Sequence, residues 1–288
     1  MTTPLSCARL VMCSMLLPLC STVYAGNIYN FTASAGLMLD DNLTRAQYKR
    51  DIYDDRAFFA SLSAGYVVIS SDYSRAVITA AAEAWQYKNA NLAHQIASLK
   101  AEYFFQPNTA FTSPWYSVSL KAGVVPYQGQ YRDQSLVEFG LGMGKRLTDA
   151  TNLRSGLSHT TISADSDIFS LSTIHAFANL DFKFGLNTLY TTLGYSTGDF
   201  NSTNTPPRPA SLINTPWLNP NDDVAFPGLT NSWTYKLDAD TWSFNLGYVL
   251  AITSNQSIDT SVLYYSAAAY AGNDYSGTIA TLSYFYRF

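Results

Sequence analysis

Apolar and polar side chains alternate with a period of two along most of this chain, in segments separated by turn residues. Residues 174–184 show it most clearly, with Ile174, Ala176, Ala178 and Leu180 at alternate positions. Successive side chains of a β-strand point to opposite faces, so the pattern predicts strands rather than helices. Twelve such segments can be counted, including residues 27–39, 57–70, 152–163 and 275–288, of which 152–163 alternates least clearly.

Alternation also occurs in soluble β-sandwiches, where the non-apolar face carries charge. Here only 13% of residues are charged, against a norm of about 25%, whereas 15% are aromatic and 21 are Tyr. The second face is instead rich in Ser, Thr, Asn and Gly, as at residues 241–247. The sequence therefore predicts an all-β fold, a single transmembrane antiparallel up-and-down β-barrel of about 12 strands, with ten or fourteen as the alternatives.

Residues 1–25 have the features of an export signal: Arg9, an apolar core and a small-residue cleavage site. A lipid anchor on Cys20 is the weaker alternative, because Leu19 is large where such sites need a small residue. No later stretch has the roughly 18 continuous apolar residues of a membrane helix. We expect residues 26–288 to form one barrel in the bacterial outer membrane, with long extracellular loops at 40–56 and 199–232. The expected mature chain has no thiol, because the cysteines are Cys7, Cys13 and Cys20.

Two stretches resemble known families. The alternating apolar residues Leu282, Tyr284, Tyr286 and Phe288 resemble the C-terminal assembly signal of bacterial outer-membrane proteins. That resemblance implies recognition by the barrel-assembly machinery and contact with outer-membrane lipid. GLMLDDNLTRA, residues 36–46, is similar to the first strand and loop of barrels from polysaccharide-export or surface-lipoprotein-delivery systems. It implies an envelope partner protein or an export complex.

Charged residues on the predicted strands alternate with the apolar ones, and therefore lie on the face that points into the barrel, which we call the inward parity. Lipid-facing Lys or Arg near the bilayer midplane costs about 2–4 kcal/mol, so these side chains are expected to line the lumen. They can form a charged constriction that selects solutes, or a ladder of ion pairs that rigidifies and blocks a small barrel. His175 has the same parity and is expected to line the pore or to pair with a charge. The predicted pore-lining residues are Glu83, Lys100, Glu102, Lys121, Glu138, Arg154, His175, Asp181 and Lys183.

Both long loops suggest roles. Residues 199–232 contain six of the 11 prolines, so this loop is expected to fold inward, to cover the mouth or to dock a partner through Trp217 and Phe226. The first loop, residues 40–56, mixes acidic and basic residues. We expect solvated charge there rather than a cation site, so no metal and no cofactor are predicted. The acidic residues that such a site would use are Asp40, Asp41, Asp54 and Asp55.

Lipid-cleaving barrels use His and Ser on the outer wall. The only histidines are His94, His159 and His175, and His159 has outward parity with Ser163 and Asp165 nearby in sequence. No strand has a close His-x-Ser spacing with a polar orienting group, so no catalytic residue is predicted.

The net charge of −4 is not that of a nucleic-acid-binding protein, which would be basic. We therefore expect a monomeric, non-enzymatic channel for passive, selective passage of small solutes. The alternatives are a non-conducting barrel that anchors or assists an export or surface-assembly complex and, more remotely, an outer-membrane lipid hydrolase.

Overall fold

A computed structural model describes residues 28–128, 131–205, 217–218, 224–229, 232–269 and 274–288. The expected signal peptide lies outside these residues. The strands are β1 (Ile28–Asp40), β2 (Asp55–Ser70), β3 (Ser74–Tyr87), β4 (His94–Phe105), β5 (Trp115–Val125), β6 (Gln134–Arg146), β7 (Thr151–Ala164), β8 (Leu171–Phe184), β9 (Asn187–Asn204), β10 (Trp217–Leu218), β11 (Trp233–Ala251), β12 (Gln256–Ala269) and β13 (Tyr275–Arg287). Two 3₁₀ turns, η1 (Lys49–Asp51) and η2 (Asp167–Phe169), lie in loops. Within the described ranges, no helix is long and apolar enough to cross a membrane.

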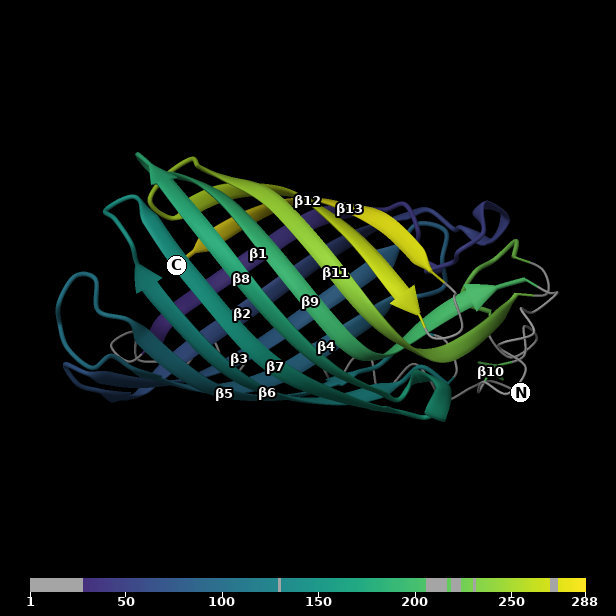
Figure 1. Cartoon of the computed structure of the whole chain (residues 1–288), viewed down its shortest axis with the longest axis horizontal. Coiled ribbons are helices and arrows are strands. Elements are labelled where there is room, and N and C mark those ends of the chain that lie inside the picture. The colour runs from purple at the N-terminus through teal and green to yellow at the C-terminus, as the bar shows by residue number, and fades with distance from the viewer. Residues whose placement is uncertain (1–27, 129–130, 206–216, 219–223, 230–231, 270–273) are drawn as a thin grey trace.

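The strands close into a barrel. Each wall strand pairs antiparallel with the next, and β9 pairs with β11. The two-residue β10 is not part of the wall, because it pairs only with Thr234 and Tyr235 near the start of β11. β1 and β13 close the ring, in register from Thr32 opposite Arg287 to Asp40 opposite Ile279. In the described part of the chain the wall therefore has 12 strands, as predicted (Figure 1). Closure leaves no unpaired edge in the wall, which is the condition for crossing lipid with strands.

The two ends of the barrel differ. Apart from the longer β4–β5 connection, short turns lie at one end, on the left in Figure 1, where the chain also ends, and longer loops lie at the other. In outer-membrane barrels the short turns face the periplasm and the longer loops face outside. We call these the periplasmic end and the outer end. The longest strands, β9 with 18 residues and β11 with 19, extend beyond the wall at the outer end.

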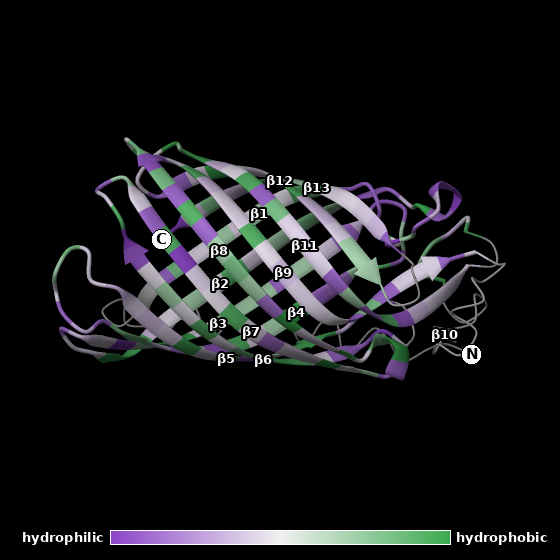
Figure 2. Ribbon diagram, viewed as in Figure 1, coloured by the Kyte–Doolittle hydropathy of each residue, from purple (hydrophilic) through white to green (hydrophobic). Residues whose placement is uncertain are grey.

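The alternate apolar residues of the strands lie on the exterior of the barrel, as the sequence predicted. On β11, Trp242, Phe244 and Leu246 are each about half exposed, at 56%, 50% and 49%. Figure 2 shows apolar and polar residues alternating along the strands around the cylinder. Large exposed apolar side chains on every wall strand would be untenable in water, whereas hydrocarbon accommodates them. The lipid-facing belt and the fold agree with the expected localisation in the bacterial outer membrane.

The end of the chain belongs to this belt. Leu282 and Tyr284 on β13 are 50% and 40% exposed, and Phe288 is 69% exposed. The Phe288 backbone N–H donates to the carbonyl of Phe31 at 2.9 Å, and the two rings lie 4.7 Å apart. The centroid of the Tyr286 ring lies 4.6 Å from that of Phe288. These contacts join the last strand to the first at the periplasmic rim.

Candidate functional site

The lumen is lined by small polar residues through its middle. On β11, Thr241, Ser243 and Asn245 have the inward parity and are partly exposed. Ser34 on β1 and Ser61 on β2 bond to each other across neighbouring strands at 2.7 Å. Small polar side chains leave space along the axis and can bind water. The inner wall can therefore hold a hydrated path.

Large inward aromatic rings lie over glycines. In five places a ring on one strand faces a glycine that is its direct register partner on the next strand. A Cβ added to any of these glycines would lie 2.1–2.6 Å from its partner's side chain. Glycine thus lets the ring lie against the wall instead of across the lumen. The pairs are Phe59 with Gly36, Trp115 with Gly144, Phe177 with Gly156, Tyr190 with Gly247 and Tyr265 with Gly277.

Four of the predicted pore-lining residues form two ion pairs. Lys100 Nζ lies 2.9 Å from Glu102 Oε2, and both belong to β4. Arg154 Nη2 on β7 lies 3.0 Å from Asp181 Oδ2 on β8 and also donates to Asn179 Oδ1 at 3.0 Å. Lys100 and Arg154 keep side-chain exposures of 36% and 51%. Each pair is therefore accessible to water and contributes only modestly to stability.

The other predicted residues have different partners. Glu138 accepts a hydrogen bond from Thr160 at 3.3 Å, and Glu83 accepts one from the Trp85 indole at 3.4 Å. His175 Nδ1 lies 2.8 Å from Ser196 Oγ, so it bonds to a hydroxyl rather than to a charge. Among the described residues, Lys121 and Lys183 form no ion pair within 4.0 Å. All nine predicted residues keep the inward parity, but they are spread along β3 to β8 rather than gathered in one ring.

Reasoning from the sequence missed a cavity at the periplasmic end. It has a volume of about 610 Å³ and lies between the β4–β5 connection, residues 106–114, and the ends of β6, β7 and β8. Basic side chains dominate its charge: Lys145, Arg146, Arg154 and Lys183 against Asp181. The Arg146 guanidinium lies 4.4 Å from the Phe111 ring centroid. The unusual length of the β4–β5 connection was the available signal.

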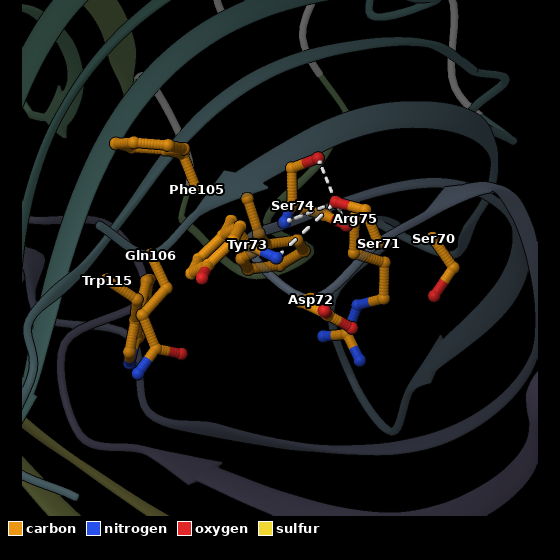
Figure 3. A pocket seen from close by; sticks show the side chains of 10 residues that line it. Ser70, Ser71, Asp72, Tyr73, Ser74, Arg75, Phe105, Gln106 and Trp115 are labelled. Carbon is orange, nitrogen blue, oxygen red and sulfur yellow. Dashed lines mark hydrogen bonds between the residues drawn. The ribbon is translucent and has the colours of Figure 1, made fainter. Parts of the chain in front are cut away.

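A second cavity of about 420 Å³ adjoins the first, because Gln106 and Trp115 line both. Figure 3 shows Arg75 in it, beside the compact Ser70–Ser74 turn between β2 and β3, with Gln106 and Trp115 on the far side. The Arg75 guanidinium lies 5.0 Å from the Phe104 ring centroid. The periplasmic mouth is thus bordered by guanidinium groups that stack on aromatic rings.

At the outer end the first loop, residues 41–54, packs into the mouth. The Asn42 side-chain amide donates to the carbonyls of Ala46 at 3.0 Å and Ser276 at 2.9 Å, which ties the loop to β13. Ser202 Oγ on β9 donates to the Arg45 carbonyl at 2.8 Å. Arg45 adopts a left-handed φ of 52°, and its guanidinium lies 5.6 Å from the Tyr265 ring centroid. The loop therefore spans from β13 and β12 to β9.

The expectation of solvated charge in this loop region is wrong for three of its acidic residues. Asp40, Asp51 and Asp55 are 5%, 0% and 7% exposed. Asp55 accepts hydrogen bonds from the backbone N–H groups of Asn89 and Ala90, at 3.0 and 2.7 Å to Oδ2. Asp40 accepts from the Asn42 backbone N–H and Asp51 Oδ1 from the Thr205 hydroxyl, so loop donors replace part of the water that each buried carboxylate loses. Across the described ranges, no group of three or more His, Cys, Asp and Glu side chains is placed to hold a metal.

The second long loop meets the first. β9 continues to Asn204 and β11 begins at Trp233, so the connection is shorter than the predicted 199–232. Phe226 is 8% exposed, packs with Ala90 and Leu92, and has its ring 5.4 Å from that of Tyr53. We call residues 41–54 and 224–229 the outer plug. Of Trp217, the structure describes only the backbone, which pairs with Tyr235 in the β10–β11 ladder.

His159 faces outward near the outer end, as its parity predicted. Its Nε2 lies 3.1 Å from Ser172 Oγ, a contact that the sequence did not indicate. The nearby carboxylate of Asp199 accepts from the Ser172 backbone N–H at 2.9 Å and lies 3.2 Å from Lys236 Nζ. In the described part of the chain, no carboxylate orients the His159 ring. The pair therefore lacks the third member that a hydrolytic triad needs.

Comparison with solved structures shows the fold. An outer-membrane channel from Pseudomonas putida F1 aligns with a TM-score of 0.61 and 11% identity, over 92% of this chain and 97% of the channel. An anion-selective porin from Comamonas acidovorans aligns at 0.44 and 7%, over 91% and 99%. The translocator domain of the autotransporter NalP from Neisseria meningitidis aligns at 0.41 and 13%, over 98% and 96%. No protein-family model and no curated protein matches the chain.

Proposed function

We propose that this protein is a channel for passive, selective passage of small solutes across the outer membrane. The observation that carries the proposal is the inner wall, where small polar side chains remain partly exposed and the large rings lie over glycines. A barrel built only as an anchor has no need to keep its rings out of the lumen. The fold shared with the Pseudomonas putida F1 channel is compatible with this function.

The outer plug is expected to limit the width of the solute path at the outer end of the barrel. Residues 41–54 and 224–229 pack at the mouth, so solutes must pass beside or through these loops. Twelve strands enclose a lumen between that of filled eight-stranded barrels and open sixteen-stranded porins. We therefore expect a low conductance and a strict size limit.

Planar-bilayer recording of the purified protein tests the proposal. Discrete conductance steps are expected, and Lys121→Ala or Glu138→Ala should change their size because both side chains lie on the inner wall. Leu186→Ala, in the short β8–β9 turn and 78% exposed, is a control that should leave the steps unchanged. A silent bilayer, with the protein shown to be folded by its resistance to unfolding in cold SDS, would refute the proposal.

The main alternative is a non-conducting barrel that anchors or assists an export or surface-assembly complex. The outer plug supports it, because its residues Phe226 and Asp51 are buried at the outer end, with exposures of 8% and 0%. This alternative expects a partner protein to copurify from mildly solubilised membranes and no conductance steps. A chain that elutes alone and conducts would exclude it. Lipid hydrolysis has weaker support, since His159 and Ser172 lack an orienting carboxylate.

A further inference from the structure

Positive charge exceeds negative charge on one half of the inner wall. On β3 to β8 the inward-facing basic residues are Arg75, Lys100, Lys121, Arg146, Arg154 and Lys183. The acidic residues of the same strands and parity are Glu83, Glu102, Glu138 and Asp181. On the other wall strands, inward Asp259 and Arg287 offset each other, while Asp40 and Asp55 are buried at the outer rim. The excess is basic although the whole chain has a net charge of −4.

The excess is concentrated from the middle of the wall to the periplasmic mouth. Arg75, Arg146, Arg154 and Lys183 lie within four residues of the periplasmic ends of their strands. Glu83 and Glu138 lie nearer the outer ends of β3 and β6. A charged lining with low-dielectric walls raises the local concentration of ions of the opposite sign. Anions are therefore favoured in this half of the lumen.

Two lysines face each other at the centre of this wall. Lys100 on β4 and Lys121 on β5 are direct register partners, and like charges in that position destabilise a sheet. Glu102 pairs with Lys100, and Glu138 on β6 is the register partner of Lys121 on its other side, but within the described residues no carboxylate oxygen lies within 4.0 Å of Lys121 Nζ. The Lys121 ammonium thus remains available to a passing anion. A structural ion-pair ladder would instead have neutralised it.

The periplasmic cavity of about 610 Å³ provides a second site with an excess of positive charge. Arg146 and Lys183 border it without an ion pair among the described residues, whereas Arg154 is paired with Asp181. Guanidinium and ammonium groups donate charge-assisted hydrogen bonds to carboxylates, phosphates and halides. Phe111 supports the Arg146 guanidinium from one face and leaves its N–H edges free to donate.

We propose that the lumen selects small anions, which move between Lys121 and the cavity bordered by Arg146 and Lys183. This inference rests on the proposed channel function and names its solute class. The basic side chains act as successive weak sites, each strong enough to attract an anion and weak enough to release it.

Bilayer recordings in a tenfold KCl gradient test the inference, because the reversal potential gives the chloride-to-potassium permeability ratio. The wild-type ratio should exceed one. The triple variant Lys121→Gln, Arg146→Gln and Lys183→Gln should lower it, by roughly threefold for each removed charge from Coulomb's law with salt screening. Arg56→Gln, at an exposed position of outward parity near the outer end of β2, is a control that removes one positive charge from the outer face of the barrel. A second arm adds inorganic phosphate, which should reduce chloride current in the wild type more than in the triple variant.

The outcomes separate the inference from the channel function. Absence of conductance steps in folded wild-type protein would overturn both. Steps with a ratio at or below one, or a ratio that the triple variant does not change, would overturn anion selection and leave the channel standing. If the triple variant does not fold, the single variant Lys121→Gln must still lower the ratio, because Lys121 forms no ion pair among the described residues.

Discussion

Replacing Gly247 tests whether glycine holds the aromatic rings against the inner wall. In Gly247→Ala the new Cβ would lie 2.1 Å from Tyr190 Cζ, far inside van der Waals contact. The backbone at this point is fixed by the β9–β11 ladder, so the ring must move. We expect the ring to move toward the lumen, because the wall lies on its other side, and this movement breaks the hydrogen bond from the Tyr190 hydroxyl to Asp259 Oδ1, now 2.9 Å long.

Two costs combine in this variant. Overpacking costs about 1–3 kcal/mol, and losing a hydrogen bond to a carboxylate costs about 1.5–3 kcal/mol. Because Tyr190 is partly exposed, water replaces some of the lost bond, and we expect the free energy of unfolding to fall by about 2–4 kcal/mol. The displaced ring should also narrow the path and lower the single-channel conductance.

Urea unfolding in lipid vesicles, followed by tryptophan fluorescence, measures the first effect, and bilayer recording measures the second. Gly140→Ala is the matched control, since its new Cβ would crowd the Ser119 hydroxyl, at 2.7 Å, which can rotate away, and would meet Ser158 Cβ at an ordinary 4.0 Å. The reasoning is refuted if Gly247→Ala matches Gly140→Ala in both stability and conductance.

Three further predictions follow from the exterior and the outer plug. Leu120→Lys, on the lipid-facing side and 54% exposed, should lower the free energy of unfolding in vesicles by about 2–4 kcal/mol, whereas its inward neighbour Ser119→Lys should cost less than 1 kcal/mol; equal losses would contradict the assigned faces. Phe226→Ala removes a ring from the outer plug and should raise conductance or open-channel noise in bilayer recordings, and an unchanged current trace would show that the plug does not limit flow. Asn42→Ala removes both amide bonds to Ala46 and Ser276, and should make residues 41–54 cleavable by external protease at concentrations that leave the wild type intact.

The sequence predicted the wall well because lipid imposes a strict rule on it. Every strand must place one parity in hydrocarbon, so the pattern survives even in the weakest segment, predicted at 152–163 and observed as β7 at Thr151–Ala164. The strand number and the inward parity of Lys121 and Asp181 followed from the same rule. Such alternation is local, and can be read without knowing which strands are neighbours.

The outer plug could not be predicted, because its residues interact across long sequence separations. Asp51 and Asp55 look like solvated charges until loop N–H and hydroxyl groups from residues 89–90 and 205 are brought to them. Residues 199–204 resemble a loop because DFNSTN has weak strand propensity. They nevertheless pair with β11, and Ser202 donates a hydrogen bond to the first loop. Likewise the glycine–ring pairs depend on register, which the alternation alone does not fix.

Labelling of single cysteines along β11 tests the two-faced wall and its hydrated lumen most directly. The natural cysteines, Cys7, Cys13 and Cys20, all precede the barrel, so replacing them leaves a suitable background. In intact membranes, a water-soluble maleimide should label Ser243→Cys and Asn245→Cys but not Phe244→Cys or Leu246→Cys, which a lipid-soluble reagent should label instead. Equal labelling at all four positions, or protection of Ser243→Cys and Asn245→Cys from the water-soluble reagent, would contradict a water-filled path through this barrel.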